Sequence, residues 1–150
     1  MKKLSFFLMA MLFSMMSFAA EATATLSFAN KAQRTVFNSN QQVWEQNGIT
    51  LTNDKASSTS AVADYYNPAR FYKSSKITIK CTLGTITQIV FDCNSSSYAT
   101  ALKSSITSGT VTVSSDKVTV VPATESEEYV IASLTGGQVR MDAVTVTYVK

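Results

Sequence analysis

Hydrophobic and polar residues alternate in short runs along most of the chain, which is the pattern of strands that bury one face. The clearest pair is Val43–Gln46 and Ile49–Thr52, which flank Asn47-Gly48, the dipeptide best suited to the two positive φ angles of a type I′ hairpin turn. Only Ser97–Ser104 has a helical pattern, and it predicts one short helix in a connection. Further strands are predicted at Thr25–Ala29, Ile77–Ile79, Ile86–Phe91, Val111–Val113, Val118–Val120, Tyr129–Ile131 and Val144–Tyr148.

Short strands at this spacing predict an all-β fold, an antiparallel two-sheet β-sandwich or jelly roll of eight to ten strands with one short helix. The many Thr, Ser and Val residues agree with this, because β-branched side chains favour strands over helices. The chain of 150 residues contains no repeat or linker, so we expect one folded domain. The longest stretch without a pattern is Asn53–Asn67, which fits a functional loop or a flexible connection.

The N-terminal segment has the features of a secretory signal peptide. Lys2 and Lys3 precede the apolar run Leu4–Ala19, and small residues follow it. The pattern predicts a signal peptide over residues 1–22 and a mature domain over 23–150, with the new N-terminus between Ala20 and Thr23. An uncleaved anchor is the alternative, which the short apolar run fits less well. We therefore expect a secreted protein, periplasmic or extracellular, that is not held in a membrane after the signal is removed.

Composition and charge exclude several function classes. The chain has no histidine, which removes Ser-His-Asp and Cys-His catalysis and the two-histidine zinc helix. The net charge of +3 comes from 13 basic and 10 acidic residues without a dense basic run, so nucleic acid is not an expected partner. No cofactor is expected either.

The carboxylates do not form a catalytic or metal-binding pattern. A glycoside hydrolase needs two carboxyl groups that face each other across a cleft. Glu127 and Glu128 are adjacent and would point to opposite faces of a strand, and nothing in the sequence pairs Glu45 with a distant aspartate. The calcium-loop motif is missing, which leaves only the scattered Asp54, Asp64 and Asp92 as candidates. We expect neither an enzyme nor a metal site.

The two cysteines, Cys81 and Cys93, lie at the ends of consecutive predicted strands. In an oxidising compartment they could form a disulfide. In a tight hairpin about Gly84 they would be offset, so a bridge needs a wider loop or a crossing between sheets. Two buried thiols are the alternative. Neither alternative makes them catalytic, because no histidine is present to activate a thiolate.

Three segments resemble a group of secreted β-sandwich domains found in Bacteroides-type gut bacteria and some Firmicutes. These segments are Ala69–Ile79, with an arginine-aromatic-lysine turn before a strand, then Ile86–Cys93, and the closing Gln138–Tyr148. The resemblance covers most of the mature chain from Trp44 onward. It implies a jelly-roll fold similar to that of carbohydrate-binding modules, and it implies no established activity.

The densest cluster of aromatic and planar cationic side chains lies at the end of the long loop. Aromatic rings can stack on the C–H faces of sugars while polar groups bind hydroxyls, so this cluster is the candidate ligand site. Tyr65 and Tyr66 are expected to be exposed, whereas Trp44 and Phe71 are expected in the core. Tyr98 could join the site. The candidate ligand-binding residues are Tyr65, Tyr66, Asn67, Arg70 and Tyr72.

Arg70 and Arg140 leave two interpretations open. Each could cap backbone carbonyls or pair with Asp64 or Asp142 at the surface. Alternatively, each could be a polar anchor for a hydroxyl or a carboxylate of a ligand.

The sequence therefore favours a secreted, non-catalytic binding domain that recognises a glycan through the aromatic cluster. The alternative is a structural or protein-interaction domain at the cell surface, with a surface protein as its partner. A glycoside hydrolase is the least favoured hypothesis.

Overall fold

The structure is a computed structural model that describes residues 19–150. The predicted signal peptide lies outside the described residues except at its last four positions. Two of these, Glu21 and Ala22, already belong to the first strand and pair with Val149 and Tyr148. Cleavage after Ala19 would leave this strand whole, whereas cleavage after Ala22 would remove its first two residues.

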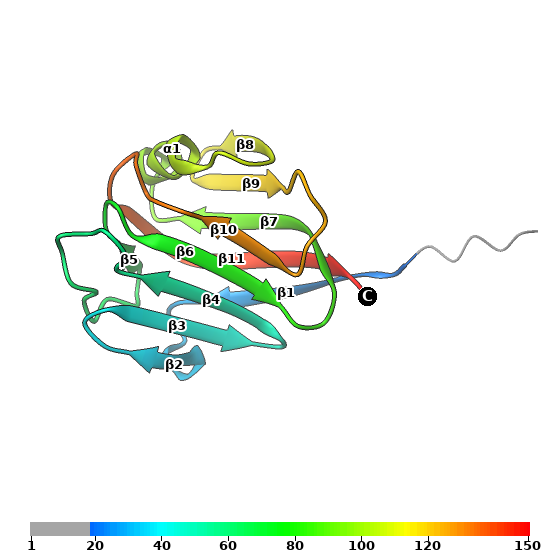
Figure 1. The fold of residues 1–150 in the computed structure, drawn as a ribbon, viewed down its shortest axis with the longest axis horizontal. Coiled ribbons are helices and arrows are strands. Elements are labelled where there is room, and N and C mark those ends of the chain that lie inside the picture. Colours follow the sequence, from blue (N-terminus) through cyan, green and yellow to red (C-terminus); the bar gives the residue numbers. More distant parts are fainter. Residues whose placement is uncertain (1–18) are drawn as a thin grey trace, which may run out of the picture.

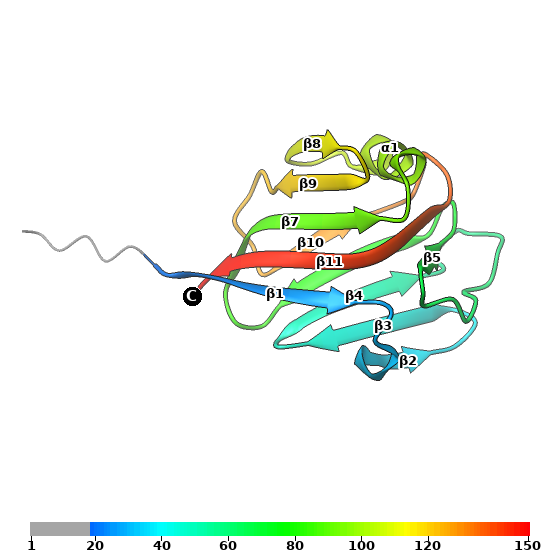
Figure 2. The same ribbon diagram turned by 180° about the vertical axis from the view of Figure 1, so that it is seen from behind.

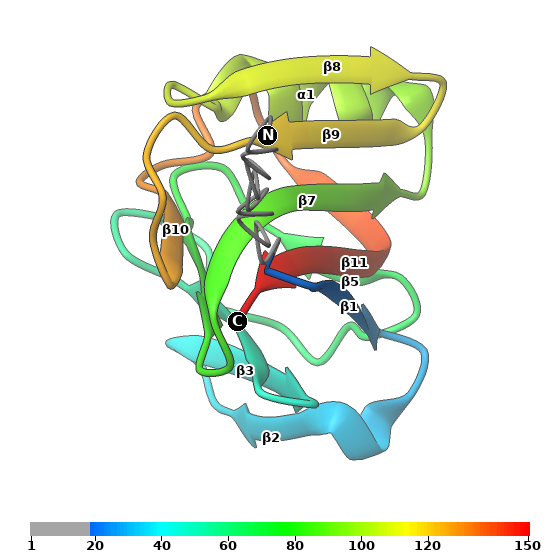
Figure 3. The ribbon, with the colours of Figure 1, turned by 90° about the vertical axis from the view of Figure 1, so that its right-hand side faces the viewer.

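Two antiparallel sheets face each other across one core (Figures 1 and 2). Sheet A has the order β1 (Glu21–Ser27), β11 (Val139–Val149), β7 (Thr85–Cys93), β9 (Lys117–Val121) and β8 (Thr110–Ser114), and β5 (Ala69–Phe71) also pairs with β11. Sheet B has the order β10 (Glu128–Ile131), β6 (Lys76–Cys81), β4 (Ile49–Asp54), β3 (Gln41–Gln46) and β2 (Arg34–Phe37). Seen from the side in Figure 3, β8, β9, β7, β11 and β1 follow one another in the order of sheet A.

The predicted all-β two-sheet sandwich is confirmed, with eleven strands in residues 19–150 rather than eight to ten. The hairpin of β3 and β4 is confirmed, and Asn47 and Gly48 have φ of 48° and 74° as a type I′ turn requires. The predicted helix is α1 (Ser96–Ser105), which packs against β7, β8, β9 and β11. A single turn of 3₁₀-helix, η1 (Lys31–Gln33), precedes β2.

Two strands were not predicted, and two begin earlier than predicted. The strand expected at Val144–Tyr148 begins five residues earlier, at Val139. The strand expected at Thr25–Ala29 begins four residues earlier and ends at Ser27. β2 was missed because three of its four residues are exposed, so its sequence has no apolar alternation. β5 was missed because three residues are too few to show a period.

An aromatic group fills the core at the end where β5 lies. Phe28, Trp44 and Phe71 are fully buried. The ring of Phe28 meets the ring of Trp44 edge-on at 5.0 Å and that of Phe71 at 5.8 Å between centroids. The expectation that Trp44 and Phe71 belong to the core is confirmed.

The two cysteines are free, buried thiols. β6 and β7 belong to different sheets, so the chain crosses between sheets at Leu83-Gly84 and then runs back. Cys81 lies beside that crossing and Cys93 at the far end of the nine-residue β7, which spans roughly 27 Å at ~3.3 Å per residue. A disulfide is excluded by this separation. Burial, with added repulsion from Asp92, Asp116 and Asp142, raises the pKa of the Cys93 thiol to about 12.

In the part of the chain that the structure describes, α1 has ten residues, and no helix is long and apolar enough to cross a membrane.

The crossing between the sheets depends on close backbone contact at Gly84. A Cβ atom there would lie 2.0 Å from the carbonyl oxygen of Val149, which cannot move without displacing the end of β11. We expect Gly84→Ala to lower the free energy of unfolding by about 2–3 kcal/mol, measured by urea unfolding. The control is Gly137→Ala, where no atom is near but φ is 125°, and which should cost only about 1 kcal/mol. Equal effects of the two variants would contradict this packing.

Candidate functional site

The loop that carries the predicted site, residues 55–68, is held in place by a buried amide of sheet B. Gln42 is fully buried on β3, and its Nε2 donates to the carbonyl oxygens of Ala63 at 3.0 Å and Tyr65 at 3.2 Å. The backbone of Val62 also donates to Ser39 O at 2.8 Å. The loop is therefore a fixed part of the structure and not a flexible connection.

A second buried amide joins β4 to β5. Asn53, which is 1% exposed, donates from Nδ2 to the carbonyl oxygen of Arg70 at 3.2 Å. Neither Gln42 nor Asn53 was predicted from the sequence to have this role. The signal was present, because each is a polar residue at a position where the alternation of its strand requires an inward-facing side chain.

The alternation of β5 and β11 places two arginines side by side on the outer face of sheet A. Ala69 and Phe71 are buried, so Arg70 between them faces outward. Val139 and Met141 are buried in the same way on either side of Arg140. Arg70 and Arg140 are direct partners in the antiparallel register, so their Cβ atoms lie about 5 Å apart.

Three tyrosines surround this pair. The guanidinium carbon of Arg70 lies 3.8 Å from the ring centroid of Tyr65 and 6.0 Å from that of Tyr72. The guanidinium carbon of Arg140 lies 5.6 Å from the ring centroid of Tyr98 on α1. We call Tyr65, Arg70, Tyr72, Tyr98 and Arg140 the Arg–Tyr cluster. It unites three of the predicted site residues and adds Tyr98 and Arg140, which the sequence left as open candidates.

Tyr66 does not belong to the Arg–Tyr cluster. Its ring is partly buried against the core, with Lys31 Nζ at 4.9 Å and the guanidinium carbon of Arg34 at 5.7 Å from its centroid. The expectation of an exposed side chain is correct for Tyr65, which is 45% exposed, and wrong for Tyr66. Asn67 is exposed beside them.

The aspartates that were expected to neutralise Arg70 and Arg140 are bound elsewhere. Arg34 Nη1 donates to Asp64 Oδ1 at 2.6 Å, and the Arg34 side chain is only 6% exposed. Asp142 is the extra residue of a β-bulge in β11, and its carboxylate accepts the Asn94 amide at 3.3 Å. The interpretation that pairs Arg70 or Arg140 with these aspartates is therefore wrong.

The ion pair changes the acidity of Asp64. The hydrogen bond from Arg34 holds the pKa of the Asp64 carboxyl below its ordinary value of 3.8, and the positive charges of Arg34 and Lys31 act in the same direction against a smaller desolvation effect. A general acid needs the opposite shift, so Asp64 has the character of a structural carboxylate.

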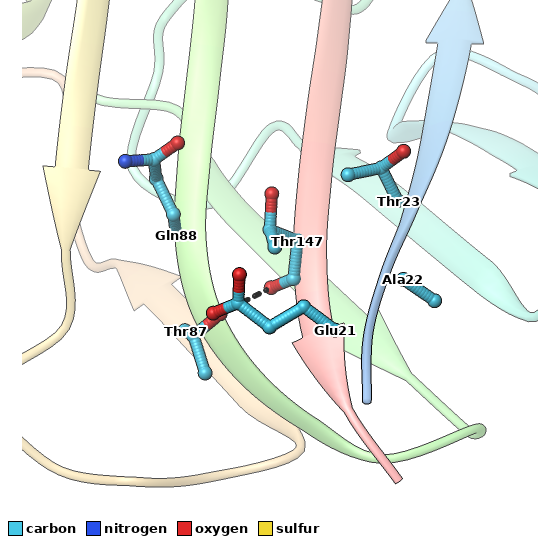
Figure 4. A pocket seen from close by; sticks show the side chains of 6 residues that line it. All are labelled: Glu21, Ala22, Thr23, Thr87, Gln88 and Thr147. Atoms are coloured by element: carbon cyan, nitrogen blue, oxygen red, sulfur yellow. Dashed lines mark hydrogen bonds between the residues drawn. The ribbon is translucent and has the colours of Figure 1, made fainter. Parts of the chain in front are cut away.

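Two hollows of the surface lie away from the Arg–Tyr cluster. One, of about 360 Å³, is formed by β1, β7 and β11 and lined by Glu21, Thr23, Thr87, Gln88, Thr147 and Ala22 (Figure 4). The hydroxyl of Thr87 donates to the Thr147 carbonyl there at 3.3 Å. A second, of about 320 Å³, has Glu128 in its lining, and this residue pairs with Lys80 at 3.5 Å. Each hollow holds one carboxylate among the described residues, whereas glycoside hydrolysis needs two.

Neither a metal site nor a large apolar patch is evident within residues 19–150. No group of three acidic or cysteine side chains could hold a metal ion there. The exposed large hydrophobic side chains are spread over separate elements: Val36 and Phe37 on β2, Tyr65 in the loop, Leu83 at the crossing, and Val113, Val121 and Val130 on β8, β9 and β10.

No family model, curated protein or solved structure matches this chain, so no relative supplies a function for it.

The buried amide of Gln42 should control the position of the Tyr65 loop. Gln42→Leu leaves two carbonyl oxygens without their donor, so we expect a loss of about 1–3 kcal/mol in the free energy of unfolding. Hydrogen exchange of residues 55–67 should increase at the same time. Gln41→Leu changes the partly exposed neighbour on β3 and is the control. Unchanged exchange in Gln42→Leu would contradict the role given to this amide.

The Arg34–Asp64 pair predicts a pH dependence of stability. A carboxyl whose pKa is lowered on folding stabilises the protein above its unfolded value near 3.8, and this stabilisation is lost as the pH falls through the folded pKa. Asp64→Asn should therefore be less stable than the wild type at pH 7, and the difference should shrink below pH 3.8. Unfolding curves between pH 2 and 7 measure this. Asp116→Asn removes a carboxylate without an ion pair among residues 19–150 and should not reproduce the effect.

Proposed function

We propose that the chain is a secreted, non-catalytic binding domain that recognises a glycan through the Arg–Tyr cluster. The observation that carries this proposal is the stacking of the Arg70 guanidinium on the exposed ring of Tyr65 at 3.8 Å. A sugar offers apolar C–H faces and hydroxyl groups together. Aromatic rings contact the former, while the N–H groups of a guanidinium donate to the latter.

The rigidity of the site supports this function. Gln42 and Asn53 fix the backbone carbonyls of Tyr65 and Arg70 from inside the sandwich. A site that is already ordered loses less conformational entropy when it binds its ligand. The ring of Tyr65 also stacks on the Arg70 guanidinium at 3.8 Å, which restrains this ring before binding.

The N-terminal sequence supports secretion, and the resemblance to secreted β-sandwich domains supports carbohydrate as the ligand class. A protein-interaction domain is supported less, because the exposed hydrophobic side chains lie on separate elements and a docking patch needs them together. A glycoside hydrolase has the least support, because each described hollow holds one carboxylate.

The experiment that tests this function compares Tyr65→Ala with Val121→Ala on a broad polysaccharide panel, by affinity electrophoresis or calorimetry. Removing the stacked ring should weaken binding by about tenfold, equivalent to 1.4 kcal/mol, without unfolding the protein. Val121 is similarly exposed, at 46%, but lies on β9, so its variant should bind as the wild type does. Absence of binding to every polysaccharide by the folded wild type would refute the proposal.

A further inference from the structure

The positive charges of Arg70 and Arg140 are not neutralised within the described part of the chain. The ion pairs of residues 19–150 join Lys31 and Arg34 to Asp64, Lys80 to Glu128, and Lys117 to Asp92. Neither Arg70 nor Arg140 takes part in any of them. The Nε atoms of both arginines are buried and find no hydrogen-bond acceptor among these residues.

This arrangement is unfavourable in the protein alone. Like charges directly opposite each other on neighbouring strands repel, and a buried N–H without an acceptor costs further free energy. The rings of Tyr65, Tyr72 and Tyr98 offset part of this cost, because the face of an aromatic ring attracts a cation. They add no negative charge and no acceptor of the strength of an oxyanion.

We infer that the ligand of the Arg–Tyr cluster is an anionic polysaccharide, whose carboxylate or sulfate oxygens bind between Arg70 and Arg140. This rests on the proposed function and deepens it. The planar fork of a guanidinium matches two oxygens of such a group, and two adjacent forks can share one group between them.

The rings explain why the anion belongs to a sugar chain. Tyr65 and Tyr72 lie next to Arg70, while Tyr98 on α1 lies next to Arg140, and the ring of Tyr65 is the exposed one of the three. A sugar ring next to the acidic group would find the exposed ring of Tyr65 to stack on. A free inorganic anion would use the arginines and leave the rings without contact.

The decisive experiment uses the wild-type protein and matched polymers. Polygalacturonate is compared with its fully methyl-esterified form, and a sulfated galactan with the same galactan after desulfation, by calorimetry. At least one charged polymer should bind about tenfold or more tightly than its neutral form. This preference should fall as salt is raised, because the site is partly exposed to solvent.

Substitutions locate the charge preference. Arg70→Gln and Arg140→Gln should each weaken binding of the charged polymer about tenfold or more, and should weaken binding of the neutral polymer less, because the neutral polymer loses only hydrogen bonds from the guanidinium to its hydroxyl groups. Lys80→Gln removes the same charge from β6 in sheet B and is the matched control. Arg70→Lys keeps the charge but loses the fork, so it should be intermediate. Circular dichroism confirms folding, and the wild-type comparison decides the question even where a variant fails to fold.

Each outcome separates this inference from the proposed function. Equal binding of charged and neutral polymers would overturn the anionic ligand while glycan binding stands. Failure to bind any polysaccharide would overturn glycan binding itself. Poly-glutamate binding as tightly as the acidic polymers would show that charge alone is recognised, and would overturn the assignment to a polysaccharide.

Discussion

Two strands, β1 and β5, pair with the same edge of β11. The position of Phe28 decides where β1 leaves that edge and where β5 can pair with it. β1 pairs with β11 from Val149 back to Ala143. At Phe28 the chain makes a last hydrogen bond, from its N–H to Asp142 O at 3.0 Å, and then leaves the edge. The ring of Phe28 is buried between Trp44 and Phe71, which removes it from water and fixes the departure of the chain.

The Arg–Tyr cluster is a consequence of this exchange of strands. Once β1 has left, the edge of β11 at Val139–Met141 is free to pair with β5. Because Phe71 must face Phe28 in the core, the alternation of β5 turns Arg70 outward, next to Arg140. The bulge at Asp142 falls at the same point and directs the nearest carboxylate toward Asn94. The burial of Phe28 and Phe71 in the core therefore also brings Arg70 and Arg140, which form no ion pair among residues 19–150, next to each other on the surface.

The sequence predicted those parts of the fold that short-range chemistry determines. Asn47-Gly48 specified its turn because few other pairs accept two positive φ angles, and the strands other than β2 and β5 followed from apolar alternation. The pairing of β5 with β11 joins residues about seventy positions apart in a strand of three residues, so no local pattern records it. The pairing of Arg70 or Arg140 with Asp64 or Asp142 was wrong for the same reason: Asp64 is bound by Arg34 and Asp142 lies in the bulge, and both arrangements form only in the folded chain.

Buried polar side chains connect the core of the sandwich to the segment that carries Tyr65 and Arg70. Gln42 and Asn53 interrupt the apolar alternation of β3 and β4, which would weaken the core unless their amides were bonded. Each donates to a carbonyl of the segment that carries Tyr65 and Arg70 and so orders that segment, while Gln42 Oε1 and Asn53 Oδ1 are buried without a donor among residues 19–150. With leucine and valine at these positions, the tyrosine loop would lose its hydrogen bonds to the core and keep only backbone hydrogen bonds such as that from Val62 N–H to Ser39 O. A polar residue at an inward position of an otherwise apolar strand therefore indicates that its side chain binds the backbone of a nearby surface segment and fixes the position of that segment.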